Sequence, residues 1–171
     1  KGRLLMTANP KVIGKEMAST VIFSDDHGLT WHNGGFTGDY ITNECTIAEL
    51  PDGRIIINMR PNETLAERYR LSSYSSDGGE TWSKPFYNYD LPDPACEGSI
   101  LATDGMLLLA NVNNAKTRSG QAISISKDEG KTWHTGSTIW PKASAYQAMQ
   151  AFPDGDIGVF YEAGESSPYE T

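Results

Sequence analysis

Ser24-Asp-Asp-His-Gly-Leu-Thr-Trp31 is the first of three copies of one pattern, S-x-D-x-G-x-T-W, in this chain of 171 residues. The other copies are Ser75-Ser-Asp-Gly-Gly-Glu-Thr-Trp82 and Ser126-Lys-Asp-Glu-Gly-Lys-Thr-Trp133, and successive copies begin 51 residues apart. Self-similarity at a fixed period of this length is typical of repeat architectures. The sequence is therefore read first as a series of repeats.

A second marker repeats in step with the first. A glycine followed by an apolar run occurs at Gly2, Gly53, Gly105 and Gly155, with spacings of 51, 52 and 50 residues. Because two separate markers share one period, the repeat does not depend on a single motif. The sequence predicts structural units of about fifty residues.

Each eight-residue motif predicts a hairpin turn. Its Asp is expected to accept backbone N–H bonds across the turn and its Gly to supply a positive φ, while Thr and Trp begin the next strand with the indole over the loop. The apolar runs 19–23, 70–74 and 122–125, which precede the motifs, have the length and alternation of strands. No segment has the pattern of a long amphipathic helix. Units of about four short strands are the blades of a β-propeller.

The number of repeats sets a further expectation. Three periods run from Gly2 to Gly155, and a fourth begins in 153–171. Propellers close with about four to eight blades. The prediction is an all-β propeller of which about three and a half blades are present, with 1–171 as one partial domain and the motifs at 24–31, 75–82 and 126–133.

Composition excludes several classes of partner. Twenty-two acidic and fourteen basic residues give a net charge of −8, which disfavours binding to nucleic acid or anionic membranes. No apolar stretch is long enough for a membrane span, and no signal-peptide leader is visible. Cys45 and Cys96 have no zinc-site spacing and are expected to be core thiols, although a bridge between them stays open.

The repeated motif is the Asp-box, and with it the chain resembles the sialidase (neuraminidase) family, whose catalytic domain is a six-bladed β-propeller. Asp-boxes also occur in propellers that are not enzymes, so all three are interpreted as structural. Residues outside the boxes carry the rest of the resemblance.

The segments Asn43-Glu44-Cys45 and Glu49–Arg60 resemble the sialidase strands in which a Glu begins one inner strand and an Arg ends the next. A turn at Pro51-Asp52-Gly53 makes these strands a hairpin, which returns Arg60 to the end that holds Glu44. The alternative is a surface Glu and an unrelated strand-end Arg.

The segment Asp93-Pro-Ala-Cys96-Glu-Gly-Ser99 is similar to the inner strand of the following sialidase blade, with Glu97 where the family usually has Gln. Arg118, in Asn111–Arg118, matches the last of the family's three carboxylate-binding arginines. Lys116 is the competing cation. A planar guanidinium binds a carboxylate with two parallel hydrogen bonds, which favours Arg118.

Ser144-Ala-Tyr146-Gln-Ala-Met resembles the segment that contains the family's nucleophilic tyrosine, although Gln147 and Ala148 depart from the usual continuation. The alternative for Tyr146 is a core tyrosine. Phe160-Tyr-Glu162 resembles a late strand whose Glu orients the first of the three arginines.

The resemblance implies a retaining exo-α-sialidase that uses no metal or organic cofactor and acts on sialylated glycans. Tyr146 would attack the anomeric carbon, Glu44 would take its proton, Arg60 and Arg118 would hold the substrate carboxylate, and Glu162 would support the site. A carboxylate nucleophile 4 Å from the substrate carboxylate would meet a repulsion of roughly 4 kcal/mol at an effective dielectric near 20, which a neutral phenol avoids. Because sialoglycans lie mostly outside cells or in lysosomes, secretion is expected, with a lysosomal location as the alternative.

The family's catalytic acid/base, an Asp, and the first of its three arginines lie early in the domain, and nothing before Asn43 resembles either segment. The 171 residues alone are therefore expected to be inactive, with the remaining blades as their partners. Two other function classes stay open: a propeller that binds sialylated glycans without cleaving them, and a structural Asp-box propeller with a protein partner.

Overall fold

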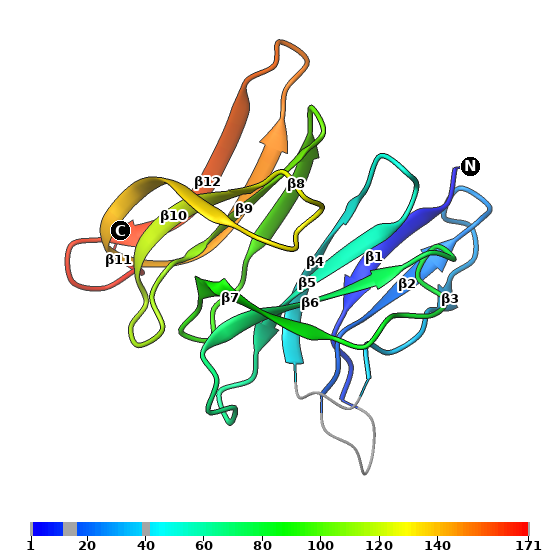
Figure 1. Cartoon of the computed structure of the whole chain (residues 1–171), viewed down its shortest axis with the longest axis horizontal. Helices are drawn as coiled ribbons and strands as arrows, with labels where there is room; N and C mark the ends of the chain where they lie inside the picture. The colour runs from blue at the N-terminus through cyan, green and yellow to red at the C-terminus, as the bar shows by residue number, and fades with distance from the viewer. Residues whose placement is uncertain (1, 12–16, 39–41, 171) are drawn as a thin grey trace.

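The computed structural model describes residues 2–11, 17–38 and 42–170. Within these ranges it contains twelve β-strands and no helix. The strands form three antiparallel sheets that follow one another in chain order, with the N-terminal sheet at one end and the C-terminal sheet at the other (Figure 1). The prediction of an all-β fold built from successive blades is confirmed.

The first two sheets are one blade each, the third sheet contains a blade and the beginning of another, and in every sheet the strands are neighbours in chain order. The first blade consists of β1 (Leu4–Ala8), β2 (Thr20–Ser24) and β3 (His32–Asn33). The second consists of β4 (Thr42–Glu49), β5 (Ile55–Pro61), β6 (Tyr69–Ser75) and β7 (Phe86–Pro92). The third sheet contains β8 (Ser99–Thr103), β9 (Met106–Val112), β10 (Ser119–Ser126), β11 (His134–Ala151) and β12 (Ile157–Gly164).

Strand β11 belongs to two blades. Its residues from His134 to Ala143 pair with β10, as the outer strand of the third blade. Its residues from Ala143 to Ala151 pair with β12, which makes this half the inner strand of a fourth blade. The fourth repeat predicted after Pro153 is thus present as a hairpin, and about three and a half blades of a propeller are described.

The Asp-boxes form the predicted turns. In the third copy, Asp128 accepts bonds from the backbone N–H and the hydroxyl of Thr132 at 2.9 and 2.7 Å, and from the hydroxyl of Ser126 at 2.8 Å. The equivalent glycines all have positive φ, with values of 90°, 90° and 88° for Gly28, Gly79 and Gly130.

One detail of the predicted turn was wrong. The Thr-Trp pair does not begin the next strand: β3 and β11 start at the residue after the Trp, and β7 starts at Phe86. The threonine is instead bonded to the turn aspartate, and the Trp133 indole N–H donates to the Gly130 carbonyl at 3.1 Å. These contacts keep both residues within the turn.

The core lies between the blades. Apolar side chains of the second and third blades form one buried cluster, made of Ala48, Leu50, Ile56, Leu91, Ile100, Leu107, Leu109 and Trp133. The other face of the second blade buries Ile57, Met59 and Leu71. Burial of such side chains stabilises the fold by roughly 1.5–3 kcal/mol each. Blade-on-blade packing therefore fixes how the inner strands meet.

Two arginines at equivalent repeat positions join neighbouring blades. Arg3 pairs with Asp25 at 2.8 Å and with Glu80 at 3.0 Å. Arg54 pairs with Glu129 at 2.7 Å, so each arginine reaches the Asp-box of the following blade. These pairs are partly exposed, and such pairs contribute about 0–1 kcal/mol each.

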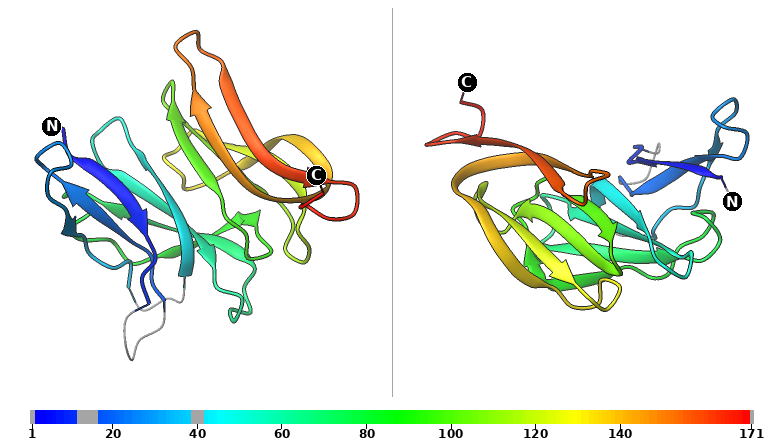
Figure 2. Two further views of the ribbon diagram at one scale, coloured as in Figure 1. Left: turned by 180° about the vertical axis from the view of Figure 1, so that it is seen from behind. Right: turned by 90° about the horizontal axis from the view of Figure 1, so that it is seen from above.

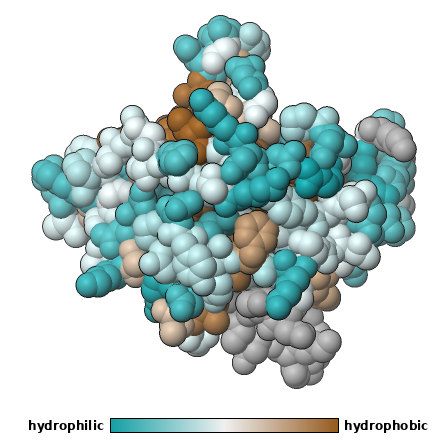
Figure 3. Space-filling view, viewed as in Figure 1, coloured by the Kyte–Doolittle hydropathy of each residue, from teal (hydrophilic) through white to brown (hydrophobic). Residues whose placement is uncertain are grey.

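The two ends of the row of blades expose apolar side chains. Leu4 and Met6 on β1 are 44% and 53% exposed, and Phe160 on β12 is 82% exposed. The views from behind and above show β1 and β12 in the sheets at opposite ends (Figure 2). In a closed propeller, such faces are where further blades pack. The broad face shown in Figure 3 is mostly hydrophilic, with small separate apolar spots.

The cysteines are free thiols among the described residues, with Cys96 buried and Cys45 partly buried. The disulfide that the sequence left open is absent there. Burial raises the pKa of each thiol to about 11, so both stay protonated at neutral pH.

Candidate active site

Glu44 and Tyr146 each lie at an irregularity in an inner strand. On β4 the register with β5 shifts between Thr42 and Cys45, the step that contains Glu44. On β11 the register with β12 shifts between Ser144 and Gln147, the step that contains Tyr146. A β-bulge re-aims the side chains that it carries. In a regular strand successive side chains point to opposite faces of the sheet, and the bulges interrupt this alternation at Glu44 and Tyr146.

The residues opposite the two bulges are Arg60 on β5 and Glu162 on β12. Tyr146 follows Glu44 by 102 residues, which is two repeat periods, and Glu162 follows Arg60 by the same number. The second and fourth blades thus use the same local geometry to present two different pairs of side chains. This equivalence was available in the sequence spacing but was not drawn from it.

Glu44, Arg60 and Tyr146 meet at one point. The Tyr146 hydroxyl donates to Glu44 Oε1, and Arg60 Nη1 donates to Glu44 Oε2, both in short hydrogen bonds. Arg60 Nη1 also lies 3.3 Å from the Tyr146 hydroxyl. The structure therefore brings together three of the residues that the sequence singled out, from two blades that are not consecutive in the chain.

The environment keeps the Tyr146 phenol neutral. Burial, followed by the hydrogen bond to Glu44 and the charge of that carboxylate, raises the pKa of Tyr146 to about 12, against the opposing effect of Arg60 and Arg118. A phenol with this pKa is almost fully protonated at neutral pH. An attack by the Tyr146 oxygen therefore needs a base. The Glu44 carboxylate, which accepts the hydrogen bond from the Tyr146 hydroxyl, is already in contact.

Arg118 lies on the other side of the tyrosine. Its guanidinium carbon is 5.7 Å from the centre of the Tyr146 ring. Nη1 donates to the Tyr169 hydroxyl at 2.8 Å and Nη2 to the Ala95 carbonyl at 3.2 Å. The competing cation, Lys116, is exposed to solvent. Of these two cations, Arg118 is the one that the fold holds beside the Tyr146 ring.

Glu162 contacts Tyr146 through the backbone. Its carboxylate accepts the Tyr146 backbone N–H at 3.1 Å. The resemblance implies that this Glu orients the first of the family's three arginines, and that role stays a prediction. What Glu162 does among the described residues is hold the bulge that carries the tyrosine.

Four further residues border this site and were not singled out from the sequence. Glu63, with a side chain 73% exposed, pairs with Arg60 Nη2 at 2.9 Å. Tyr169 bonds Arg118. Arg70 and Asp93 form a fully buried ion pair at 2.7 Å, which holds the segment leading to Glu97. Apart from the pair of Arg60 and Glu63, which are three residues apart, these contacts join distant parts of the chain, so sequence patterns give no signal for them.

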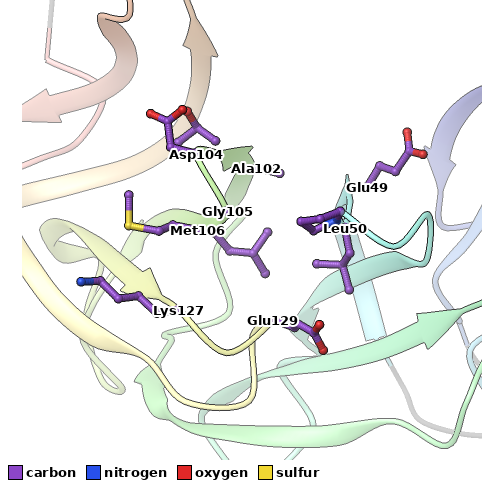
Figure 4. Close-up of a pocket in the computed structure, with 11 residues that line it drawn as sticks. Glu49, Leu50, Ala102, Asp104, Gly105, Met106, Lys127 and Glu129 are labelled. Carbon is purple, nitrogen blue, oxygen red and sulfur yellow. The ribbon is translucent and has the colours of Figure 1, made fainter.

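A separate cavity lies elsewhere. It has a volume of about 430 Å³ and lies between the β4–β5 turn, the β8–β9 hairpin and the third Asp-box, where Leu50, Met106 and Lys127 line it (Figure 4). None of the site residues above lines it. In the described part of the chain, no cluster of His, Cys, Asp or Glu is arranged to hold a metal ion. In the same ranges, no helix is long and apolar enough to cross a membrane.

Comparison with known proteins gives consistent matches. The BNR repeat-like domain family matches residues 1–159. The sialidase of Micromonospora viridifaciens is 34% identical over 158 residues, which cover 86% of this chain and 24% of that protein. The chain thus spans about a quarter of that relative's length.

Solved structures agree on the fold. The Hadza microbial sialidase Hz136 matches with a TM-score of 0.82 and 25% identity, over 94% of this chain and 32% of that one. An intramolecular trans-sialidase from Ruminococcus gnavus, solved with oseltamivir carboxylate, matches with a TM-score of 0.73 and 25% identity, over 99% of this chain and 37% of that one. The family match covers nearly the whole sequence, and the blades of this chain superimpose on those of a solved sialidase. This chain therefore belongs to the sialidase family of Asp-box, or BNR, repeat proteins.

Proposed function

We propose that residues 1–171 are part of the catalytic propeller of a retaining exo-α-sialidase, which releases terminal sialic acid from glycoconjugates. The observation that carries this proposal is the hydrogen bond from the Tyr146 hydroxyl to Glu44. It joins a nucleophile with a proton acceptor, which is the arrangement that nucleophilic catalysis requires.

In the proposed reaction, the Tyr146 oxygen attacks the anomeric carbon and the bond to the leaving alcohol breaks, while the alcohol oxygen takes a proton from a general acid, which the resemblance implies is an Asp not identified in this sequence. Glu44 takes the phenolic proton as the new carbon–oxygen bond forms. Water then displaces the tyrosine and gives a proton to that Asp, and Glu44 returns the phenolic proton to Tyr146. Two displacements at one carbon give net retention. Because the raised pKa of Tyr146, about 12, leaves little phenolate at neutral pH, the reaction depends on this proton transfer.

Arg60 and Arg118 are proposed to bind the substrate carboxylate. Arg118 has a partly exposed guanidinium beside the tyrosine ring. Arg60 Nη2 is paired with Glu63, whose largely exposed carboxylate can be displaced by that of a substrate. Charge-assisted bonds to a planar guanidinium fix both the position and the orientation of a carboxylate. Glu162 is proposed to support the site by holding the Tyr146 backbone.

A test of the proposal uses the full-length protein, with the propeller blades that lie outside this chain. The measurement is release of a fluorogenic aryl from an aryl α-sialoside, with proton NMR of the first-formed sugar to establish its anomeric configuration. Retained configuration and loss of turnover in Tyr146→Phe support the proposal, whereas an inverted product overturns it. The R. gnavus relative is named as an intramolecular trans-sialidase, so the NMR spectrum also distinguishes free from intramolecularly linked sugar.

The second candidate function is a sialic-acid-binding propeller without catalysis. The pairing of Tyr146 with Glu44 favours the enzyme, because binding a carboxylate needs the arginines but not a phenol with its base. Sialic acid binding by the full-length protein, combined with no turnover of any sialoside, would favour the lectin-like function.

A further inference from the structure

Side chains of each inner strand bind the backbone of the next inner strand. Thr46 Oγ1 on β4 accepts the N–H of Ile100 on β8 at 3.1 Å. Ser99 Oγ on β8 accepts the N–H of Met149 on β11 at 3.0 Å. These bonds satisfy donors at the open edges of the inner strands, where an unpaired buried N–H is costly. They also fix how far each inner strand lies from its neighbour.

Glu97 makes the same type of contact next to the tyrosine. Its Oε2 accepts the backbone N–H of Gln147 at 3.1 Å and lies 3.3 Å from the Gln147 side-chain nitrogen. That nitrogen also donates to the Glu97 carbonyl at 2.6 Å, and the Gln147 amide oxygen accepts from Gln121. Gln147 directly follows Tyr146 and is 5% exposed. Glu97 therefore binds the backbone of β11 one residue after Tyr146.

Glu97 differs from Thr46 and Ser99 in carrying a charge. Burial raises the pKa of Glu97 to about 7, and repulsion from Glu44 on β4 and Asp93 acts in the same direction. The Gln147 N–H and the Arg70 guanidinium on β6 oppose this rise. The Glu97 carboxyl therefore changes charge near pH 7, and it interacts electrostatically with Glu44, the proposed base.

We propose that Glu97 is a positioning residue of the reaction proposed above, and that its carboxylate holds the Tyr146–Gln147 backbone so that the phenol stays aligned with Glu44. The inference rests on the proposed function. A fixed backbone next to the phenol keeps its oxygen in line with the carboxylate that accepts its proton.

The direction of the pH effect follows from these charges. Above neutral pH the Glu97 carboxylate is ionised and accepts the Gln147 N–H more strongly. Below neutral pH this stronger hydrogen bond is lost. Turnover is therefore expected to rise as pH increases through about 7. The rise is limited to about tenfold, because a hydrogen bond to a charged acceptor is stronger than one to a neutral acceptor by roughly that factor in an equilibrium constant.

The experiment compares three variants of the full-length protein by the pH dependence of kcat. Glu97→Gln keeps an oxygen that can accept the Gln147 N–H but removes the charge. It is therefore expected to lose the rise in kcat near pH 7, called the neutral step here, and to keep at all pH values the lower kcat that the wild type has below pH 7. Glu97→Ala also loses the acceptor and is expected to be slower still. Ser99→Ala, the matched control, loses a bond to the same strand but keeps the step. A neutral step that persists in Glu97→Gln overturns the inference.

A second readout does not depend on activity. For a carboxyl with a raised pKa, the stability it contributes is fully present below its unfolded pKa of about 4.3 and is lost as pH rises through the folded pKa near 7. The Tm of Glu97→Gln should therefore match wild type near pH 4 and exceed it above pH 7, and exchange of the Gln147 amide should accelerate in Glu97→Ala only. Absence of turnover in the wild type rejects the proposed function, whereas unchanged Tm profiles and amide exchange reject the Glu97 contact itself.

Discussion

The Tyr146 hydroxyl is hydrogen-bonded to Glu44 across a separation of 102 residues. The two side chains come from the inner strands of the second and fourth blades, and each lies at a register shift of its strand. The blade between them contributes Glu97 and Ser99, which hold the strand of the tyrosine. The contact between Tyr146 and Glu44 therefore depends on the packing of the second, third and fourth blades.

Replacement of the phenol tests the nucleophile. Tyr146→Phe removes the attacking oxygen and keeps the ring beside Arg118, so kcat for an aryl sialoside should fall by about 10³-fold or more. The Tm should change by only a few degrees, which circular dichroism can measure. Tyr89→Phe, at a tyrosine 66% exposed on β7, is the control and should keep wild-type turnover. Wild-type-like turnover in Tyr146→Phe would remove Tyr146 from its proposed role.

Neutralising Glu44 tests the base. Glu44→Gln keeps the shape of the side chain but cannot take a proton, so kcat should fall by about 10²- to 10⁴-fold while KM changes little. Glu49→Gln, on the exposed end of the same strand, is the matched control. Steady-state kinetics with an aryl sialoside separate the two parameters. Unchanged kcat in Glu44→Gln would show that another group activates the phenol.

A charge-conserving change tests the proposed carboxylate site. Arg118→Lys keeps a positive charge but loses the planar pair of donors, so KM should rise by about 10- to 100-fold. Lys116→Met removes the exposed cation two residues earlier and should leave KM near its wild-type value. An unchanged KM in Arg118→Lys together with a raised KM in Lys116→Met would mean that only general positive charge matters there.

The Asp-box carboxylates should make stability depend on acid. Although burial opposes it, the bonds from Thr132 and Ser126 lower the pKa of Asp128 to about 2. Stability from this group is therefore present above the unfolded pKa of about 3.9 and is lost as pH falls towards 2. Asp128→Ala should cost about 1–3 kcal/mol in the free energy of unfolding at pH 7. Urea unfolding should show this cost shrinking below pH 4, and a cost independent of pH would contradict the assignment.

A glycine in the third Asp-box is required by both backbone and packing. Gly130 has a φ of 88°, and a Cβ there would lie 2.5 Å from Ile56 Cδ1 of the second blade. Gly130→Ala should therefore cost more than Gly105→Ala, where φ is 73° but nothing lies within 4 Å. Backbone strain alone is worth about 1–3 kcal/mol. Thermal unfolding compares the two, and Ile56→Val added to Gly130→Ala should recover part of the difference. Equal costs would show that the contact with Ile56 is unimportant.

The sequence by itself determined the fold. Two markers with a period of about fifty residues specify blades, because Asp, Gly, Thr and Trp at fixed positions form the same local turn each time, and this depends on contacts within eight residues. The hairpin that returns Arg60 to Glu44 is likewise local and was predictable from Pro51-Asp52-Gly53. The candidate site residues could be named from the resemblance, although their roles stay predictions.

Only the tertiary structure decided which of these residues touch. The bulges on β4 and β11, the grip of Glu97 on Gln147, and the pairing of Arg118 with Tyr169 all join strands or loops from different parts of the chain. No local pattern encodes them, because they arise from the angle and spacing at which whole blades pack on their apolar faces. The charge on each group follows from the same packing, since burial and neighbouring blades set the pKa values of Tyr146 and Glu97.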